Sequence, residues 1–543
     1  MSSFLNEVRR RRTFAIISHP DAGKTTLTEK LLLFSGAIQI AGAVKGRKAS
    51  RHATSDWMEI EKQRGISVAS SVMQMLYRDR VINLLDTPGH KDFSEDTYRV
   101  LTAVDSALMV IDAANGVEAQ TRRLIEVCRQ RDTPIITFVN KMDREVRDPL
   151  DILDEVEREL GMPCVPMTWP VGQGKSFGGI INLRTQAMTV FDSGSERLPQ
   201  DFETHALTEQ AFLAERFGSE WVSAMESMEL ATGASPTFDK EAFLAGKQTP
   251  VFFGSGVNNF GVMEVLDALV DLAPAPRPRL SHLVVNNQTV EKIIQPEDEG
   301  FAGVVFKVQA NMDANHRDRI AFVRVASGKF TPGMKLKVQR TAKELRPTSV
   351  VTFMSQRREA VEEAYAGDII GFTTHGGVQL GDTITDGPAL QFTGLPFFAP
   401  ELFMTVILKN PLRTKQLQQG LDQLGEEGAI QVFKPEAGGA MLLGAVGQLQ
   451  FEVVQHRLKA EYDCDVKLES CQYTGARWIT ADTPAELREF NYAYPQRMAL
   501  DAANTLAYLC TSPYDVRLAQ ERFPKIHFHP LREHAGLALS TAG

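Results

Sequence analysis

The chain has 543 residues, of which 43% are hydrophobic and 23% are charged, and its formal net charge is −9. This length exceeds what one hydrophobic core supports, so three or more domains of ordinary globular composition are expected. The acidic balance argues against indiscriminate nucleic-acid binding, and no apolar run reaches the roughly 18 residues that span a membrane.

The cysteines and the N-terminal residues bear on the cellular compartment. Residues 1–12 have no apolar signal core, and the basic run 9–12 is expected to be solvated rather than to bind nucleic acid. The five cysteines show no metal-binding spacing and lie at Cys128, Cys164, Cys464, Cys471 and Cys510. An odd, scattered set of this kind indicates free thiols in a reducing cytoplasm.

Apolar runs and helical patterns alternate from Thr13 to about Leu272. Buried strands are expected at residues 14–18, 81–86, 107–112, 135–140 and 251–254. Helices are expected at residues 24–34, 119–130 and 149–160. This alternation predicts a mainly parallel, doubly wound sheet that is covered by helices on both faces.

We place the first domain at residues 1–272, with one insertion inside it and a linker after it. From about residue 166 to 249 a hairpin-like part and polar helices break the alternation, which predicts an inserted subdomain. The segment APAPRPR, residues 273–279, has three prolines in seven residues and is expected to be a stiff linker.

A β-barrel is expected after the linker, at residues 280–394. Short β-rich runs separated by turn signals such as Thr331-Pro332-Gly333 are typical of barrels. These runs lie at residues 301–310, 319–330, 334–340, 349–355 and 368–374.

An α+β domain is expected at residues 395–530, followed by a tail at 531–543. A strand, a helix, two strands, a helix and a strand follow one another at 401–409, 412–424, near 430 and 442, 448–460 and 464–468. That order is the split βαβ of ferredoxin-like domains. RNA-recognition modules share it, but residues 441–447 lack the aromatics used for base stacking, so plain packing is favoured.

The stretch SHPDAGKTT follows the first expected strand and matches a phosphate-binding loop, with Ser18 where the usual first glycine stands. The N–H groups of such a loop and helix start form a nest for phosphate oxygens. Lys24 supplies a charge to the outer phosphates, and the Thr25 hydroxyl can ligate Mg²⁺. The expected binding residues are Ser18, His19, Pro20, Asp21, Ala22, Gly23, Lys24, Thr25 and Thr26.

The segment DTPGH follows the second of these expected strands, at Asp86, Thr87, Pro88, Gly89 and His90. Asp86 is expected to hold Mg²⁺ through water, and the bare N–H of Gly89 is expected to meet a γ-phosphate. His90 lies where a side chain can orient an attacking water. Taken alone, His90 is better explained as a structural residue that caps a turn.

The segment NKMD ends another strand, at Asn140, Lys141, Met142 and Asp143. A carboxylate at Asp143 can accept the N1–H and N2–H₂ donors of guanine, which adenine does not present. The backbone of Ser255 and Gly256, after the last strand, is expected to meet the guanine carbonyl.

All four motifs follow strands, and the carboxyl ends of strands are where doubly wound sheets bind ligands. The sequence therefore predicts an α/β P-loop GTPase domain that binds GTP/GDP and Mg²⁺. Lys24, Gly89 and His90 are the expected catalytic residues.

With these motifs the chain resembles the translational GTPases, the family that includes elongation factors Tu and G. Residues 61–67, EKQRGIS, resemble the effector segment of the family, with Ser67 in place of its threonine. The resemblance implies that Ser67 ligates Mg²⁺ and that His90 orients the attacking water. Residues 324–328, RVASG, resemble the second-domain barrel of the family.

Within this family the chain is most similar to the bacterial release-factor GTPases. The similarity extends over nearly the whole chain and is carried by SHPDAGKTT, SDWMEIEKQRGIS, LLDTPGHKDFSEDTYR, NFGV, ANMDANHRDRIAF and RLAQERFP. It implies a ribosome-stimulated GTPase that removes decoding (class I) release factors after peptide release. The implied partners are the ribosome with its rRNA and those factors, with no membrane or DNA partner, for a cytoplasmic monomer.

Two alternatives remain open. A translocase like elongation factor G would carry a long region after the barrel, whereas here one region follows, from about residue 395. A scaffold that binds GTP without hydrolysing it would be expected to lack Lys24, Ser67 or His90. All three positions carry usable groups, which favours hydrolysis.

Overall fold

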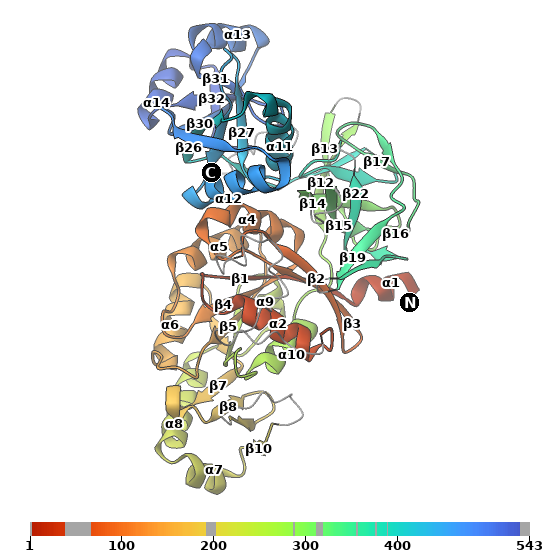
Figure 1. Cartoon of the computed structure of the whole chain (residues 1–543). Coiled ribbons are helices and arrows are strands. Elements are labelled where there is room, and N and C mark those ends of the chain that lie inside the picture. The colour runs from red at the N-terminus through yellow and green to blue at the C-terminus, as the bar shows by residue number, and fades with distance from the viewer. Residues whose placement is uncertain are drawn as a thin grey trace. The chain divides into compact units, whose positions relative to one another are not determined.

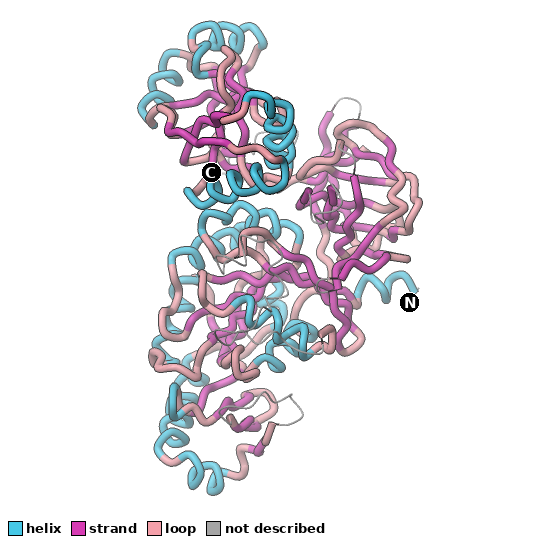
Figure 2. Tube along the Cα trace, viewed as in Figure 1, coloured by secondary structure: helices cyan, strands magenta, loops and turns pink. Residues whose placement is uncertain are grey.

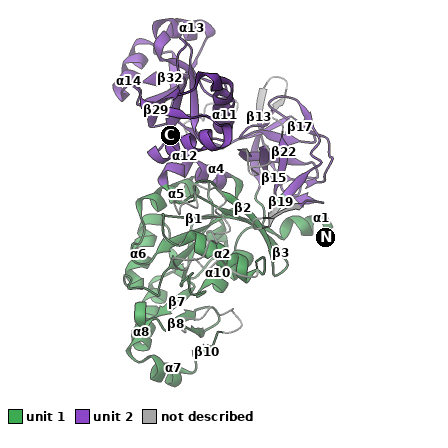
Figure 3. Ribbon diagram, viewed as in Figure 1, with its two compact units in different colours: residues 1–90, 103–277, 352–359 green, residues 91–102, 278–351, 360–543 purple. Residues whose placement is uncertain are grey.

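The computed structural model describes residues 3–38, 67–191, 202–285, 288–310, 319–354, 357–374, 377–387 and 389–532. It forms two compact units (Figure 3). Unit 1 comprises residues 1–90, 103–277 and 352–359, and unit 2 comprises residues 91–102, 278–351 and 360–543. Among the described residues, no helix has the length and apolar character that crossing a membrane requires.

A seven-stranded sheet is the centre of unit 1, with the order β2-β3-β1-β4-β5-β11-β6 (Figure 1). β2 pairs with β3 in the antiparallel sense, and every other neighbouring pair is parallel. The strands are β1 (Arg11–Ser18), β2 (Ser71–Tyr77), β3 (Arg80–Asp86), β4 (Ser106–Asp112), β5 (Ile135–Asn140), β6 (Cys164–Pro166) and β11 (Thr249–Phe253). The predicted mainly parallel, doubly wound sheet is confirmed.

Helices flank this sheet (Figure 2), with α2 packed against α10 and α5 packed against α6. The helices are α1 (Ser3–Arg9), α2 (Lys24–Phe34), α5 (Ala119–Gln130), α6 (Pro149–Leu160) and α10 (Val262–Asp271). Local signals set the ends of α6. The Asp148 carboxylate accepts the Leu150 N–H at 2.8 Å, Pro149 starts the helix, and Gly161 ends it at φ 62°.

Only the first half of the basic run at residues 9–12 is solvated as predicted, because Arg9 is exposed and Arg10 is partly exposed. β1 begins at Arg11, and the Arg11 and Arg12 residues are only 5% and 8% exposed. Arg11 donates to the Glu7 carboxylate of α1 at 2.6 Å, and Arg12 donates to the Arg9 carbonyl at 2.8 Å. The prediction is wrong for Arg11 and Arg12 because it counted their charges without the acceptors that Glu7 and Arg9 of α1 provide.

The insert lies between β6 and β11 and has its own sheet, in the order β10-β9-β8-β7. Its elements are β7 (Thr168–Val171), β8 (Gly179–Asn182), β9 (Ala187–Val190), β10 (Thr204–Ala206), α7 (Gln210–Phe217), α8 (Ser219–Ala234) and α9 (Lys240–Leu244). The buried Trp169 indole donates to Ser227 Oγ at 3.0 Å, which joins β7 to α8. The predicted domain and insert boundaries stay predictions.

A β-barrel is present, as predicted, and it belongs to unit 2 apart from residues 352–359, which are assigned to unit 1. Its strands form sheets with the orders β13-β12-β24 and β18-β17-β23-β14-β15-β22-β19-β20, with the short pair β16-β21. The longer strands are β12 (Arg279–Val285), β13 (Gln288–Ile294), β14 (Ala302–Ala310), β15 (Arg319–Ser327), β19 (Val350–Met354) and β22 (Ile369–Thr374). The shorter strands are β16 (Lys329–Phe330), β17 (Leu336–Val338), β18 (Glu344–Leu345), β20 (Arg357–Ala360), β21 (Ala364–Tyr365), β23 (Thr383–Thr385) and β24 (Leu390–Phe392).

The C-terminal part of unit 2 begins with the predicted ferredoxin-like order. Its elements are β26 (Leu402–Leu408), α11 (Thr414–Glu426), β27 (Gln431–Pro435), β28 (Leu442–Ala445), α12 (Gln448–Tyr462) and β29 (Val466–Ser470). The sheet order β29-β26-β28-β27 continues into β31-β32-β30-β33, a second half that the sequence left unassigned. That half consists of β30 (Gly475–Ala481), α13 (Pro484–Ala493), β31 (Met498–Leu500), β32 (Leu506–Cys510), α14 (Pro513–Arg522) and β33 (Ile526–His529).

Helix α4 (Ser94–Ala103) directly follows the DTPGH segment and was not predicted. Residues 91–102, which include most of it, belong to unit 2. Asp92 accepts the Leu449 N–H at 2.9 Å, and Glu95 accepts from Arg99 at 3.1 Å and from the Gln431 amide at 3.1 Å. The buried face of this helix is therefore partly charged, and the Glu95 carboxylate has its partners inside unit 2.

Candidate nucleotide-binding site

The phosphate loop connects β1 to α2. Its turn requires two residues in the left-handed region, Asp21 at φ 63° and Gly23 at φ 98°. Aspartate tolerates that conformation, whereas at Gly23 a Cβ would also lie 2.3 Å from Asn140 Nδ2. α2 then begins at Lys24, so the N–H groups of its first turn face the loop as an anion-binding helix start.

Lys24 and Asp86 form a buried ion pair across the sheet edge. The two residues are 6% and 2% exposed, and Lys24 Nζ bonds Asp86 Oδ1. Asp86 Oδ2 is buried and has no hydrogen-bond partner in the described part of the chain. A carboxylate with one engaged and one spare oxygen fits the water shell of a divalent cation beside a nucleotide phosphate.

The DTPGH loop lies directly against the phosphate loop. Thr87 Oγ1 donates to the Ile16 carbonyl of β1 at 2.7 Å. A Cβ at Gly89 would lie 3.4 Å from the Pro20 backbone, so the two loops are in van der Waals contact at this point. His90 is half-buried and ends this loop, before the short helix η1 (Lys91–Phe93).

Asn140 and Lys141 link three loops. The Asn140 side chain donates to the Ala22 carbonyl and accepts the Gly256 N–H, both at 2.8 Å, and Asn140 is only 3% exposed. Lys141 Nζ donates to the Asp21 carbonyl at 2.5 Å and to Asp112 at 2.7 Å. These two residues therefore tie the phosphate loop to the base-binding loops.

Asp143 faces the loop after β11. Ser255 Oγ donates to Asp143 Oδ1 at 2.6 Å, and the Asn258 amide donates to Ser255 Oγ at 3.0 Å. The Met142 N–H bonds the Gly254 carbonyl at 3.1 Å. The Asp143 carboxylate is thereby oriented through one oxygen, and no hydrogen bond among the described residues uses the other.

The structure brings residues 18–26, 86–90, 140–143 and 255–256 together at the carboxyl edge of the sheet. Ser67 is half-buried, while residues 61–66 of the effector segment lie outside the described residues. Sequence reasoning missed Asp112, the last residue of β4, which pairs with Lys141. Its position at the end of a buried strand on the same edge was the available signal.

No cluster of three or more His, Cys, Asp or Glu side chains in the described ranges could hold a metal ion on its own. Mg²⁺ commonly binds through one or two protein oxygens together with substrate phosphates and waters. The Thr25 hydroxyl and Asp86 match that pattern. The five cysteines are free, and burial raises the pKa of Cys128 to about 12.

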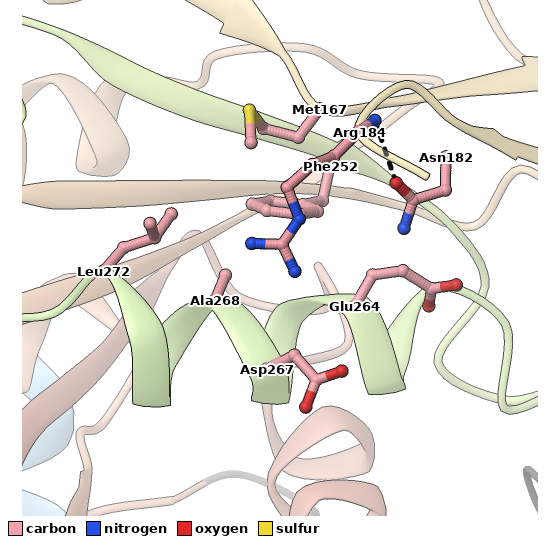
Figure 4. Close-up of a pocket in the computed structure, with 8 residues that line it drawn as sticks. All are labelled: Met167, Asn182, Arg184, Phe252, Glu264, Asp267, Ala268 and Leu272. Atoms are coloured by element: carbon pink, nitrogen blue, oxygen red, sulfur yellow. Dashed lines mark hydrogen bonds between the residues drawn. The ribbon is translucent and has the colours of Figure 1, made fainter. Parts of the chain in front are cut away.

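A separate pocket lies beside α10 in unit 1 (Figure 4). Its lining comprises Met167, Asn182, Arg184, Phe252, Glu264, Asp267, Ala268 and Leu272. The Arg184 N–H donates to Asn182 Oδ1 at 3.0 Å, and burial raises the pKa of Glu264. None of these residues belongs to the four nucleotide loops, so this pocket is distinct from the candidate site.

Three parts of the chain match known families. Residues 9–275 match the Elongation factor Tu GTP binding domain, and residues 300–387 match Elongation factor G domain 2. Residues 392–520 match the family described as Class II release factor RF3, C-terminal domain.

Full-length relatives carry one name. The chain is 66% identical over 531 residues to peptide chain release factor 3 of Bordetella pertussis, covering 98% of each chain. It is 64% identical over 540 residues to the protein of that name in Nitrosomonas europaea, covering 99% of each. A crystal structure from Thermus thermophilus superposes with a TM-score of 0.67 at 24% identity, covering 87% of this chain and 69% of the other, which supports the fold.

Proposed function

The chain belongs to the peptide chain release factor 3 family of translational GTPases, and from this premise we propose that it frees decoding (class I) release factors from the ribosome after peptide release. As a family member it acts in translation termination, hydrolyses GTP and interacts with the ribosome. We further propose that it works as a monomer in the cytoplasm.

The observation that carries the proposal is the set of four loops in unit 1 that side-chain hydrogen bonds connect through the phosphate loop and Asn140. Asn140 alone joins the phosphate loop, its own strand end and Gly256. Such a set of loops can report the bound nucleotide, because a change at one phosphate moves loops that share hydrogen bonds. The match of residues 392–520 to a release-factor domain supports termination over translocation.

We assign the phosphate end as follows. Lys24 neutralises the outer phosphates, and Thr25, Ser67 and Asp86 hold Mg²⁺, which lowers the charge on the transferred phosphoryl group. The Gly89 N–H donates to the γ-phosphate. His90 orients the attacking water.

We assign the base end to three residues. Asp143 accepts two guanine N–H groups while the Ser255 hydroxyl orients the carboxylate through Oδ1, as supported by the 2.6 Å bond between them. The Gly256 backbone faces the guanine carbonyl. Because adenine offers no matching pair of donors, this arrangement favours GTP over ATP.

The decisive experiment follows a fluorescent decoding factor on ribosomes from which the peptide has been released. Added with GTP, the protein should speed dissociation of the factor, and it should hydrolyse GTP faster with ribosomes than without. Lys24→Ala should abolish both effects because it loses the phosphate contact. A peptide-release assay and a translocation assay on the same ribosomes are the controls.

Each outcome selects one function. Equal factor dissociation with and without the protein would refute the recycling proposal. Movement of tRNA and mRNA would favour a translocase instead. GTP binding without ribosome-stimulated turnover would favour a scaffold.

A further inference from the structure

His19 and Glu118 form a side-chain pair that the functions assigned above do not use. His19 Nε2 lies 2.9 Å from Glu118 Oε2, and the side chains are 31% and 27% exposed. His19 is the first residue after β1, and Glu118 is the residue before α5. Because β1 and β4 are parallel neighbours, the loops that follow them lie side by side, which brings the two residues together.

Both side chains forgo the hydrogen bonds expected of their positions. Glu118 occupies the N-cap of α5, yet it makes no side-chain hydrogen bond to the helix N–H groups. His19 Nδ1 is buried with no hydrogen-bond partner among the described residues. Because Nδ1 makes no bond that orients the ring, the contact between Nε2 and Glu118 determines how this ring is oriented.

The His19–Glu118 pair contacts the first half of the phosphate loop, whereas the side chains of Asn140 and Lys141 bond its second half. Asn140 and Lys141 bond the carbonyls of Ala22 and Asp21, in the second half of the loop. In the described structure, the 2.9 Å contact between Nε2 and Glu118 Oε2 is the polar side-chain contact that joins His19 to the loop after β4. A Cβ at Gly89 would contact the Pro20 backbone at 3.4 Å and the His19 carbonyl carbon at 3.7 Å, so this first half lies against Gly89.

We propose that His19 and Glu118 are a positioning pair that holds the first half of the phosphate loop against Gly89 and thereby slows the release of GTP more than that of GDP. The inference rests on the proposed site, in which the Gly89 N–H serves the γ-phosphate. GDP lacks that phosphate and depends mainly on the second half of the loop and on Lys24. Loss of the pair therefore weakens the contact with the γ-phosphate more than the contacts that GDP also makes.

The test measures release of N-methylanthraniloyl GTP and GDP from the full chain by stopped-flow displacement. His19→Ala and Glu118→Ala should each speed GTP release about 5-fold and GDP release about 2-fold or less, the upper end of the scale for one partly exposed side-chain pair. The double variant should be no faster than the faster single variant, because both remove the same contact. Glu118→Gln keeps an acceptor oxygen and should restore most of the parental rate.

Arg122→Ala is the matched control. Arg122 lies on the same helix and pairs with Glu159 at 2.6 Å, with no contact to the phosphate loop, so release rates should stay parental. If His19→Ala fails to fold, the two Glu118 variants still decide the question. Unchanged rates, effects that multiply in the double variant, or equal acceleration of GDP and GTP would overturn the proposal.

The proposed site has its own readout in the same experiment. Lys24→Ala should bind neither labelled nucleotide tightly. Tight nucleotide binding by Lys24→Ala would refute the proposed site itself. If Lys24→Ala loses tight binding while His19→Ala and Glu118→Ala release nucleotide at the parental rate, the positioning pair alone is refuted.

Discussion

Each unit contains a buried cluster of a cation with carboxylates. The two clusters differ in whether every carboxylate oxygen has a hydrogen-bond partner. In unit 2, Arg457 bonds both oxygens of Glu427 at 2.6 and 3.3 Å and both oxygens of Glu461 at 2.6 and 3.0 Å. In unit 1, Lys24 bonds one oxygen of Asp86, and the second oxygen is buried with no partner among the described residues.

The difference separates a structural cluster from a binding site. Burial works against the charge of Arg457, but Glu427 and Glu461 more than offset it, so the pKa of Arg457 is raised above its usual value. Every carboxylate oxygen and every guanidinium nitrogen of that cluster has a hydrogen-bond partner. Asp86 instead leaves an acceptor unsatisfied, which is costly unless something else bonds it.

The largest expected effect is on stability at the complete cluster. Arg457→Met should lower the free energy of unfolding by about 3–5 kcal/mol, because Glu427 is left buried without its cation. GTP affinity should stay parental. Urea unfolding followed by circular dichroism, with a nucleotide titration beside it, measures both.

Arg122→Met supplies the exposed reference for that measurement. The Arg122 side chain is half exposed, so losing its pair with Glu159 should change stability little. If Arg457→Met instead lowered GTP affinity as strongly as Lys24→Ala, the contrast between a structural and a functional cluster would fail.

Sequence reasoning found the elements whose signals are local. The bounds of α2, α5 and α6 agree with the prediction, because Gly23, Glu118 and the Asp148-Pro149 pair mark their starts. α4 was not predicted because its buried face includes Glu95 and Arg99, and the short helix before it buries Asp92. Their partners lie more than 300 residues along the chain, so these charges resemble those of a solvated surface.

The same distinction applies to the candidate site. Each loop carries its own motif, so residues 18–26, 86–90 and 140–143 were found one at a time. The pairs that join loops, Lys141 with Asp112 and His19 with Glu118, depend on which strands are neighbours. The strand order β3-β1-β4-β5 is a property of the folded sheet and is not written in any single motif.

A second test separates nucleotide binding from GTP turnover in the candidate site of unit 1. His90→Ala should reduce ribosome-stimulated GTP turnover about 100-fold and leave GTP affinity nearly unchanged, because the histidine is proposed to act on the attacking water. Single-turnover hydrolysis and equilibrium binding measure the two quantities. A large loss of affinity with parental turnover would assign His90 to the structure of the turn.

The smallest expected effect concerns Asp143, the second carboxylate with one oxygen engaged. Asp143→Asn keeps an oxygen for the Ser255 hydroxyl, which bonds Oδ1 at 2.6 Å, and replaces the other oxygen with an N–H₂ donor. Guanine offers donors to that position, whereas xanthine offers a carbonyl in place of the amino group. GTP affinity should therefore fall about 10-fold while xanthosine triphosphate affinity rises, since a bidentate contact to a base is worth about 1–3 kcal/mol. Competition between the two nucleotides measures the change, with Arg122→Ala as a control that should keep the parental preference. If Asp143→Asn also kept that preference, Asp143 would not recognise the base. A carboxylate oxygen without a hydrogen-bond partner would then not indicate a ligand-binding residue in this protein.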